Sequence, residues 1–386
     1  MVQKQKSVAL LIETSNAYAR NLLRGVLSFI QLHESWSIYL PEQQRGALPP
    51  DWLKGWKGDG LIARIETEEI AAFVQSLNLP VVDVSAARFV PEIPFVETDD
   101  TAIANLAFEH FHERGFEHFA FCGDSEFKWS ALRESAFSAA VGRAGHACHL
   151  FHSTPRWSTV FSLERERARL ADWIGSLPRP AALFACYDIQ AQAILDVCRE
   201  QKIRVPEEIA LLGVDNDELL CSLCTPPLSS VIPAAQETGR EAARLLDLMM
   251  SGGSIDRLEY LMEPLGVATR QSTDVLAIDD PDIAAAVRFI RDSACEGIDV
   301  QDVLRRVPLS RRALERRFKQ IIGRTPHQEI VRRRVERIRR YLIETDLTLA
   351  QIARRTGFQN EEYMSVTFRR AIGIPPGTYR RQQGKR

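Results

Sequence analysis

Short apolar runs alternate with amphipathic stretches along the first ~270 residues of the chain. Runs such as 209–214 are typical of buried strands, and stretches such as 236–250 place apolar residues at helical spacing. Strand–helix alternation predicts parallel sheets covered by helices, and two successive series predict two α/β lobes with a cleft between them. The expected strands are 7–13, 60–64, 80–84, 95–97, 118–122, 148–151, 181–186, 209–214 and 229–232. The expected helices are 18–32, 67–77, 101–113, 130–142, 162–175, 189–201 and 236–250, the last returning to the first lobe.

A duplicated unit follows, at 303–326 and again at 352–376. An offset of 50 aligns the apolar pair Leu314 and Phe318 with Met364 and Phe368. Each copy predicts a short helix, a tight turn and a second helix that is capped by Ser310 or Asn360, which is the helix-turn-helix plan. Gly323 and Gly373 are expected to end the second helices. We therefore divide the chain into an effector-binding and dimerisation domain at 1–270, a linker at 271–283 and a DNA-binding domain at 284–386, with helix-turn-helix units at about 301–322 and 349–372.

The second helix of each unit carries polar residues on the face opposite its apolar pair. We expect these residues, with their flanking positions, to contact DNA: Arg311, Arg312, Glu315, Arg316 and Lys319 in the first unit, and Asn360, Glu362, Ser365 and Arg369 in the second. An Arg-rich helix at 326–343 connects the units, and its length of ~27 Å approaches one turn of DNA, about 34 Å.

The net charge of −2 conceals a strong asymmetry along the chain. Residues 281–386 contain 24 basic and 12 acidic side chains, a net charge of +12, and the preceding residues carry −14. A basic domain dominated by Arg favours a polyanion partner, since the planar guanidinium matches both phosphate and guanine edges. A helical bundle with a solvated Arg-rich face is the alternative, and charge alone does not separate the two interpretations.

Polar residues follow several expected strands of the two lobes, at the edge where open α/β sheets bind ligands. Asn16, Asp188 and Asp215 come shortly after strand ends, and Trp129 and Arg133 lie at the start of a helix. Taken singly, each has a structural explanation: Asp188 and Asp215 as helix caps, and Arg133 as half of an ion pair. Taken together, carboxylates, an Arg and an aromatic ring suit a small polyhydroxylated ligand.

Other classes of site find little support. The seven cysteines are scattered, Cys221 and Cys224 lack a second ligand pair, and the stretch 146–152 is expected to alternate between strand faces. No P-loop, G-x-S-x-G or H-E-x-x-H motif occurs. We expect no metal, no cofactor and no enzyme activity, although Asp188 and Asp215 as paired carboxylates of a sugar enzyme remain an alternative.

The longest early apolar run is too short for a signal peptide or a membrane span, which disfavours an exported sugar receptor and predicts a cytoplasmic protein.

The segments at 96–123 and 205–246 resemble the effector domain of the lactose-repressor family, which has the two-lobed fold of periplasmic sugar-binding proteins. The resemblance covers most of residues 7–270 and implies that Arg133 and Asp215 hold sugar hydroxyls. That family carries an N-terminal DNA-binding headpiece, whereas here the first expected strand begins at residue 7.

The motifs "SRRALERRFK", "LTLAQIARRTGF" and "FRRAIGIPPGTYR" resemble the arabinose-regulator (AraC) family of bacterial transcription factors. This resemblance runs through nearly all of residues 284–380 and implies base contacts from Arg312, Glu315 and Arg316. In the second unit it points to Glu362 and Val366, where members often carry Arg at the latter position. The second unit is therefore expected to contact mainly phosphates.

The order of the two domains resembles that of the xylose operon regulators, a family of activators that respond to D-xylose. The resemblance implies a homodimeric transcription regulator that binds double-stranded operator DNA on the nucleoid, contacts RNA polymerase and is switched by a sugar. Another sugar or small metabolite as effector is the alternative, because the fold does not determine the ligand.

Overall fold

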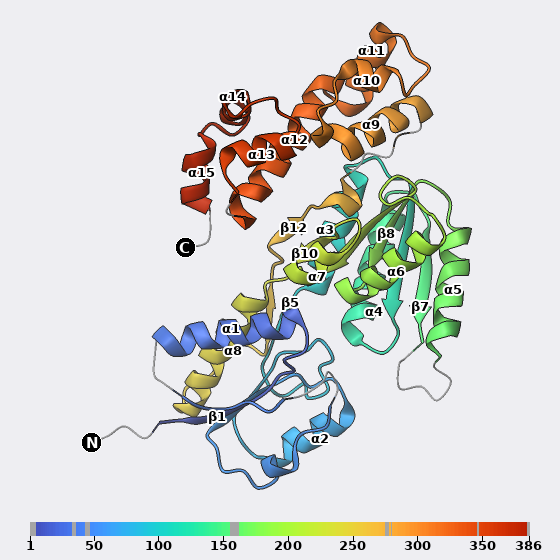
Figure 1. Ribbon diagram of the computed structural model, residues 1–386. Coiled ribbons are helices and arrows are strands. Elements are labelled where there is room, and N and C mark those ends of the chain that lie inside the picture. Colours follow the sequence, from blue (N-terminus) through green and yellow to red (C-terminus); the bar gives the residue numbers. More distant parts are fainter. Residues whose placement is uncertain are drawn as a thin grey trace. The chain divides into compact units, whose positions relative to one another are not determined.

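The structure is a computed structural model, and it describes residues 5–32, 36–42, 47–154, 162–274, 278, 280–345 and 347–383. The chain forms two compact units, Met1–Val275 and Leu276–Arg386, which we call the body and the tail (Figure 1). The body contains two lobes, each built around one sheet, and the tail is helical.

The sheet of lobe 1 is parallel throughout the pairings described. Its strands are, in order across the sheet, β11 (Glu259–Met262), β5 (Phe95–Thr98), β4 (Val81–Asp83), β3 (Gly60–Ala63), β1 (Ser7–Leu11) and β2 (Ser37–Tyr39). Helices α1 (Ala17–Leu32) and α8 (Ala235–Met250) pack together over one face, and α2 (Glu68–Ser76) and the short helix η1 (Asp51–Leu53) cover the other (Figure 1). Buried apolar side chains on both faces explain why these strands read as continuous apolar runs.

The sheet of lobe 2 has one antiparallel edge strand. Its strands are, in order, β12 (Gly266–Ala268), β10 (Ser229–Ile232), β9 (Ile209–Val214), β8 (Ala181–Ala185), β6 (His118–Asp124) and β7 (Cys148–Ser153). The helices of this lobe are α3 (Asp100–His112), α4 (Lys128–Arg143), α5 (Leu163–Ser176), α6 (Asp188–Glu200) and α7 (Glu218–Leu223). Helices α3 and α4 pack against each other, as do α5 and α6.

In the described part of the body, the chain crosses between the lobes after β5, after β10 and after β11. The two-lobed α/β prediction is confirmed, and α8 returns to lobe 1 as expected. The sequence pattern missed β2, β11 and β12, because these strands are short and partly exposed. It also grouped α3 with the first series, whereas α3 packs on α4, β10 and β12 in lobe 2.

The first residues of the expected linker belong to the body. Ser272 and Thr273, in the short helix η2 (Gln271–Thr273), are fully buried. The Ser272 hydroxyl donates to the Leu211 carbonyl at 2.6 Å and accepts the Ser229 amide at 2.8 Å. These bonds let polar side chains be buried without an energetic penalty, which a polar sequence pattern does not reveal.

The tail has two apolar cores that share one long helix. Its helices are α9 (Pro281–Ser293), η3 (Ala294–Glu296), α10 (Val300–Leu304), α11 (Arg311–Ile322), α12 (Pro326–Glu344), α13 (Leu349–Arg355), α14 (Glu361–Ile372) and α15 (Pro376–Gln383). The first core joins α9, α10 and α11 to the start of α12, and the second joins α13, α14 and α15 to its later turns. Ser310 and Asn360 cap α11 and α14, and Gly323 and Gly373 end them with positive φ, as expected.

A close backbone contact joins the two halves of the tail. Gly357 has a φ of +73°, and a Cβ there would lie 2.6 Å from the Gly297 nitrogen, so the contact requires glycine. Arg334 of α12 reinforces it by donating to the Ala294 and Ile298 carbonyls, both at 2.7 Å. Its guanidinium also lies 5.4 Å from the ring centre of Phe358, next to Gly357. The two helix-turn-helix units are thus held to each other by backbone packing as well as by α12.

Candidate functional site

A cavity that is partly open to solvent lies between the two lobes of the body. Its lining comes from both lobes and consists of Tyr18, Arg64 and Glu97 on one side and Trp129, Arg133, Tyr187 and Asp215 on the other. Arg64 follows β3, Tyr187 comes shortly after β8 and Asp215 follows β9, so the carboxyl ends of parallel strands supply these residues.

On the side of lobe 1, hydrogen bonds hold the polar side chains in place. The Tyr18 hydroxyl donates to Glu97 Oε1 at 2.5 Å. Arg64 pairs with Glu13 through Nη1 and donates from Nη2 to Glu66 Oε1 at 2.6 Å. Because all of these side chains are buried, the two carboxylates compensate the Arg64 charge and position its planar group beside the cavity.

Glu97 is prepared to donate a hydrogen bond to a ligand. Burial raises its pKa to about 8, with the Arg64 charge opposing and the Asp100 carboxylate adding to the shift, so the carboxyl is mostly protonated at neutral pH. Its second oxygen, Oε2, is buried and has no hydrogen-bond partner among the described residues. A buried polar atom of this kind is unusual in a folded protein, and it leaves Glu97 with unused hydrogen-bonding capacity.

On the side of lobe 2, Arg133 and Trp129 lie on α4 and approach each other, with the guanidinium carbon 4.9 Å from the ring centre. Arg133 Nε donates to Asp100 Oδ1 at 2.7 Å, and its Nη1 donates to the Cys186 carbonyl at 2.6 Å. Burial alone lowers the pKa of Arg133, but the carboxylates of Asp100 and Asp215 outweigh it and raise the pKa, so the guanidinium stays charged. The ring centres of Trp129 and Tyr187 lie 5.6 Å apart with the rings nearly perpendicular, and together they form an aromatic wall of the cavity.

Asp215 occupies an unusual backbone conformation at the end of β9. Its φ is +108°, a region that L-residues rarely adopt, and Asn216 follows with a φ of +48°. The helix cap is supplied two residues later by Asp217, whose side chain accepts the Leu220 amide. Asp215 is therefore not the cap that one sequence interpretation allowed, and strain of this kind concentrates at ligand-binding sites.

Asn16 and Asp188 are not among the described residues that line the cavity. Asn16 donates a hydrogen bond to Glu13 and accepts one from the Ala19 amide. It therefore holds the Glu13 carboxylate in position to pair with Arg64. Asp188 accepts the Asp217 amide at 2.9 Å and the Ser230 hydroxyl at 2.7 Å. Burial, followed by the nearby Asp215 charge, raises the pKa of Asp188 to about 8. Both residues shape the loops from which cavity residues project.

Four lining residues were absent from the sequence-based set: Tyr18, Arg64, Glu97 and Tyr187. The rule that found Asp215 also applies to Arg64, because Arg64 directly follows an apolar strand. Glu97 gave a different signal, as a carboxylate within the buried strand β5. Tyr187 also follows an expected strand, the one that ends at Cys186, but only its neighbour Asp188 was chosen from that strand end. Tyr18 does not stand out in sequence, since a tyrosine at a helix start is ordinary.

The buried carboxyl groups of the body predict a pH-dependent stability. Burial raises the pKa of Asp83 to about 7, although the Ser85 and Ile65 amides donate to its Oδ1. A raised pKa in the folded state means that stability is complete below the unfolded value near 4 and falls as pH rises towards 7. We expect Asp83 alone to remove ~2–3 kcal/mol between pH 5 and pH 8, measured by urea unfolding.

Asp83→Asn is the control, because the amide keeps an oxygen for both backbone donors and does not titrate. Its unfolding free energy should fall less between pH 5 and pH 8 than that of the unchanged protein. An equal pH dependence in the two proteins would contradict the assignment of a neutral Asp83.

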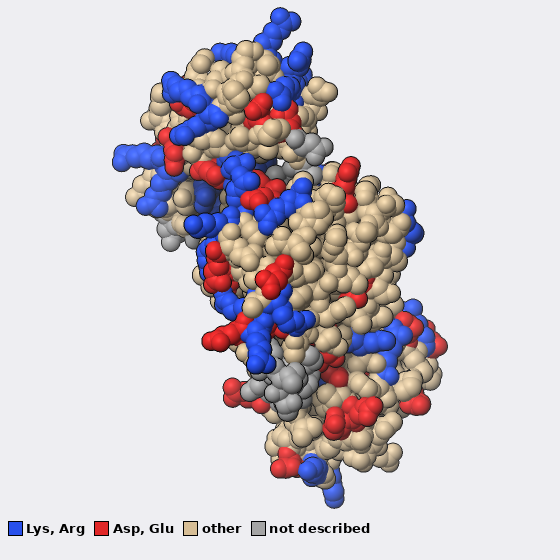
Figure 2. Space-filling model, turned by 90° about the vertical axis from the view of Figure 1, so that its right-hand side faces the viewer, with Lys and Arg blue, Asp and Glu red and all other residues tan. Residues whose placement is uncertain are grey.

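The predicted DNA-contacting residues gather on the solvent side of α11 and α14. Arg311, Arg312, Arg316 and Lys319 are exposed on α11, and Asn360, Glu362 and Arg369 are exposed on or beside α14; Glu315 and Ser365 are partly exposed. Figure 2 shows many Lys and Arg side chains on the tail, at the top of that view. The residues beneath this surface, Leu314, Phe318, Met364 and Phe368, are fully buried as expected.

Not every Arg of α11 faces solvent in this way. Arg317 donates from Nε to Asp280 Oδ2 at 2.7 Å and also pairs with Asp282, at the start of α9. Arg311 pairs with Glu315 one turn along the helix at 3.0 Å, with the Arg311 side chain largely exposed and that of Glu315 partly exposed. Exposed pairs of this kind contribute little to stability, so both side chains can exchange partners readily.

The described ranges contain neither a metal site nor a membrane-spanning helix. Within these ranges, no cluster of three or more His, Cys, Asp or Glu side chains is arranged to hold a metal ion. No helix in the same ranges combines the length and apolar composition that a bilayer crossing requires.

Comparisons with known proteins cover both units. Three family models match: a XylR N-terminal domain at residues 7–101, a periplasmic binding protein-like domain at 108–273 and a helix-turn-helix domain at 303–382. The xylose operon regulatory protein of Escherichia coli K12 is 33% identical over 98% of both chains. Its counterpart from Haemophilus influenzae is 29% identical over 98% of this chain and 99% of its own. A solved structure of the xylose-binding transcription activator XylR matches the whole of both chains at 32% identity, with a TM-score of 0.80.

Proposed function

Since the chain belongs to the family of xylose operon regulatory proteins, we propose that it is a DNA-binding transcription regulator whose body senses D-xylose. The observation that supports this most strongly is that one chain contains both a candidate sugar-binding unit and a candidate DNA-binding unit. A cavity lined by hydroxyl-binding groups occupies the body, and the tail carries two helix-turn-helix units with exposed polar faces.

The chemistry of the cavity favours a neutral polyhydroxylated ligand over an anionic one. Both guanidinium groups already have carboxylate partners, Arg64 with Glu13 and Glu66, and Arg133 with Asp100. No net positive charge is therefore left to balance a phosphate or a carboxylate group of a ligand. Asp215 as an acceptor, Glu97 as a donor and the apolar ring of Trp129 match the hydroxyls and the apolar face of a pentose.

On the DNA side, α11 and α14 are proposed to enter successive major grooves. Each of them is the second helix of its helix-turn-helix unit. Helix α12, which joins the two units, has 19 residues and a length of ~28 Å. With the packing offsets of two flanking helices, that length is compatible with a separation of about 34 Å, one turn of DNA.

The wider proposal concerns how the two units work together. We propose a homodimer formed through the body, in which the sugar favours a closed arrangement of the lobes and changes how the two tails meet adjacent half-sites. The sugar shifts this equilibrium only by its difference in affinity for the two arrangements. As an activator the protein would contact RNA polymerase and work in the cytoplasm, where bacterial DNA lies.

We propose that the cavity binds without catalysis. Asp188 and Asp215 would be the pair of acidic groups needed by a sugar enzyme, but the Asp188 carboxyl already accepts from Ser230 and from the Asp217 amide. It also stands outside the cavity lining. Consumption of a pentose by the purified protein would contradict this part of the proposal.

The sugar is tested by thermal unfolding of the full chain with D-xylose, L-arabinose, D-ribose and D-glucose. A ligand at 100 times its Kd should add about 2.7 kcal/mol of apparent stability. We expect the largest shift for D-xylose. A larger shift with another sugar would keep the regulator and replace its effector, whereas no shift with any sugar would contradict the proposed cavity.

On the DNA side, Arg316→Ala should weaken operator binding by about 1–3 kcal/mol and relax the preference at one base pair. Arg316 is exposed on α11, where its forked guanidinium can reach a guanine edge. Lys319→Ala is the matched control, since a phosphate contact should weaken all sequences alike and lower the salt slope by about one. Fluorescence anisotropy at several salt concentrations separates the two; a uniform loss with Arg316→Ala would identify a phosphate contact instead.

A further inference from the structure

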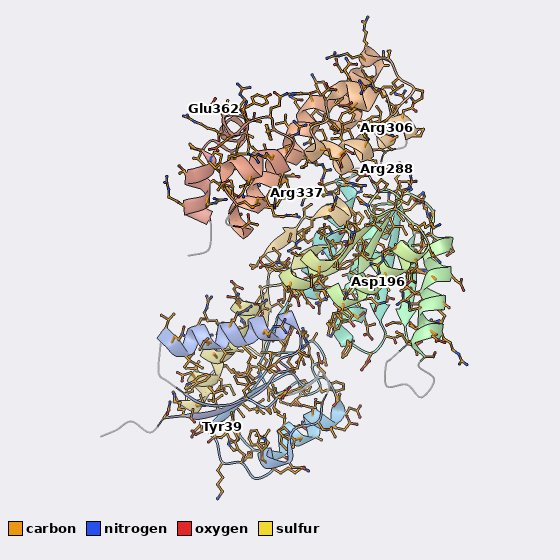
Figure 3. The ribbon with its side chains drawn as sticks, viewed as in Figure 1. Tyr39, Asp196, Arg288, Arg306, Arg337 and Glu362 are labelled. Carbon is orange, nitrogen blue, oxygen red and sulfur yellow. The ribbon has the colours of Figure 1, made fainter. Side chains whose placement is uncertain are left out.

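The recognition helices α11 and α14 share a framework but differ in the side chains that they expose. Both have a side-chain cap, a buried apolar pair and a left-handed glycine at the end. At equivalent outward positions, Arg312 of α11 corresponds to Glu362 of α14, and Arg316 corresponds to Val366. Glu362 is exposed on α14 (Figure 3), and Val366 is 56% exposed.

These two residues are poorly suited to the phosphate backbone. A carboxylate at Glu362 is repelled by phosphates, and the Val366 side chain cannot donate a hydrogen bond. Cations on α14 occur only in its last turn, at Arg369 and Arg370, and both are exposed. Within the first turns of α14, Glu362 and Val366 therefore offer no donor group to a phosphate, while the last turn supplies two cations.

The same two residues match base edges of the major groove. A carboxylate accepts a hydrogen bond from the N4 amino group of cytosine, and an aliphatic side chain contacts the C5 methyl group of thymine. Glu362 and Val366 are four residues apart, so they lie on one side of the helix one turn from each other. Contact with a thymine methyl group would remove the exposed Val366 side chain from water, which is favourable for an apolar group.

We propose that α14 reads DNA directly, with Glu362 contacting cytosine and Val366 contacting thymine. This inference rests on the proposed DNA-binding function of the tail and replaces the expectation that the second unit contacts mainly phosphates. Arg312 and Arg316 of α11 suit guanine, so each half-site should contain a guanine-bearing subsite and, one turn away, a subsite with cytosine and thymine on the contacted strand.

An acidic and apolar face could also bind another protein, such as a subunit of RNA polymerase. The matched architecture of α11 and α14 favours DNA, because the cap, the buried pair and the terminal glycine place Glu362 and Val366 where α11 places its own base-reading positions. Protein binding is therefore an outcome of the test.

The test selects bound sequences from a random duplex library, using the full chain with D-xylose. Gln binds adenine through its N6 and N7 atoms, so Glu362→Gln should change the preferred base from cytosine to adenine at one position. Glu361→Gln is the matched control, because Glu361 is exposed at the adjacent position, and its selected sequence should not change. An unchanged preference with Glu362→Gln would overturn the assignment of Glu362.

Val366 is tested by replacing single thymines of the selected duplex with deoxyuridine, which removes only the C5 methyl group. One replacement should weaken binding by about threefold to fourfold, the effect of one buried methyl group. The same replacement should weaken DNA binding by Val366→Ala less, because the shorter alanine side chain makes less contact with the methyl group. Equal effects in both proteins, or none in either, would overturn the contact.

The two levels of failure are distinguishable. If the Glu362 and Val366 variants select the original sequence while Arg316→Ala still weakens binding, the regulator stands and the readout by α14 is wrong. If these variants keep their DNA binding but lose transcription in a purified system with RNA polymerase, the face binds protein and the readout is equally wrong. If the unchanged protein selects no sequence at all, both the proposed function and this inference are overturned.

Discussion

Arg133→Ala should destabilise the body by about 3–5 kcal/mol, because it leaves the buried Asp100 carboxylate without its ion-pair partner. Both side chains of this pair are at least 94% buried, and Arg133 also satisfies the Cys186 carbonyl. Urea unfolding should show an earlier transition for the body. Sugar affinity should fall as well, since Arg133 lines the cavity.

A double variant separates these two roles. Arg133→Met with Asp100→Asn removes both charges and keeps most of the volume, so much of the lost stability should return. Sugar binding should not return, because the guanidinium that we propose as a donor to ligand hydroxyls is still missing. A double variant that binds D-xylose like the unchanged protein would show that Arg133 serves only the fold.

Asp215→Asn should lower pentose affinity at least tenfold. A carboxylate that accepts two ligand hydroxyls contributes ~1.5–3 kcal/mol for each charge-assisted bond, and ~1.4 kcal/mol is a factor of ten. Asn has the shape of Asp and the same backbone preferences, so the substitution should add no strain at this positive φ. Calorimetry with D-xylose measures the affinity, and sugar-free binding of DNA should be unchanged because Asp215 lies in the body.

Asp217→Asn is the matched control for this change. Asp217 caps α7 two residues away, and Asn caps about as well as Asp. It also lies 3.5 Å from Arg20 of α1 in a partly exposed pair of small energetic value. We expect near-normal pentose affinity for Asp217→Asn; equal losses in the two variants would mean that the loop as a whole, and not the Asp215 carboxylate, determines binding.

The sequence predicted the architecture because parallel sheets leave long apolar runs, and because helix caps and terminal glycines mark the tail helices. Ser310, Asn360, Gly323 and Gly373 all act as their residue types indicate. Strands β11 and β12 were missed since they are short and only partly buried. Their positions depend on chain crossings between lobes, which no local pattern encodes.

The candidate cavity was only half predictable. Asp215, Arg133 and Trp129 were found from strand ends and from the resemblance of the body to sugar-binding repressors. Asn16 and Asp188 met the same criteria, yet their side chains turn to bond Glu13 and the Asp217 amide. The direction in which a side chain turns depends on the partners that the fold brings to it, and Tyr18 and Glu97 reach the cavity for the same reason.

In the proposed mode of DNA binding, the contact between Gly297 and Gly357 fixes the distance between the two base-reading helices. With its two halves joined through backbone and through Arg334, the protein has little freedom to lengthen or rotate the step between recognition helices. One base pair added between the two subsites turns the second groove by about 35° around the helix axis, since a turn holds 10–10.5 base pairs. The DNA must then twist to bring both grooves to the two helices, and this twisting costs deformation energy. An operator with the wrong spacing should therefore bind more weakly, even when all of its contacted bases are correct.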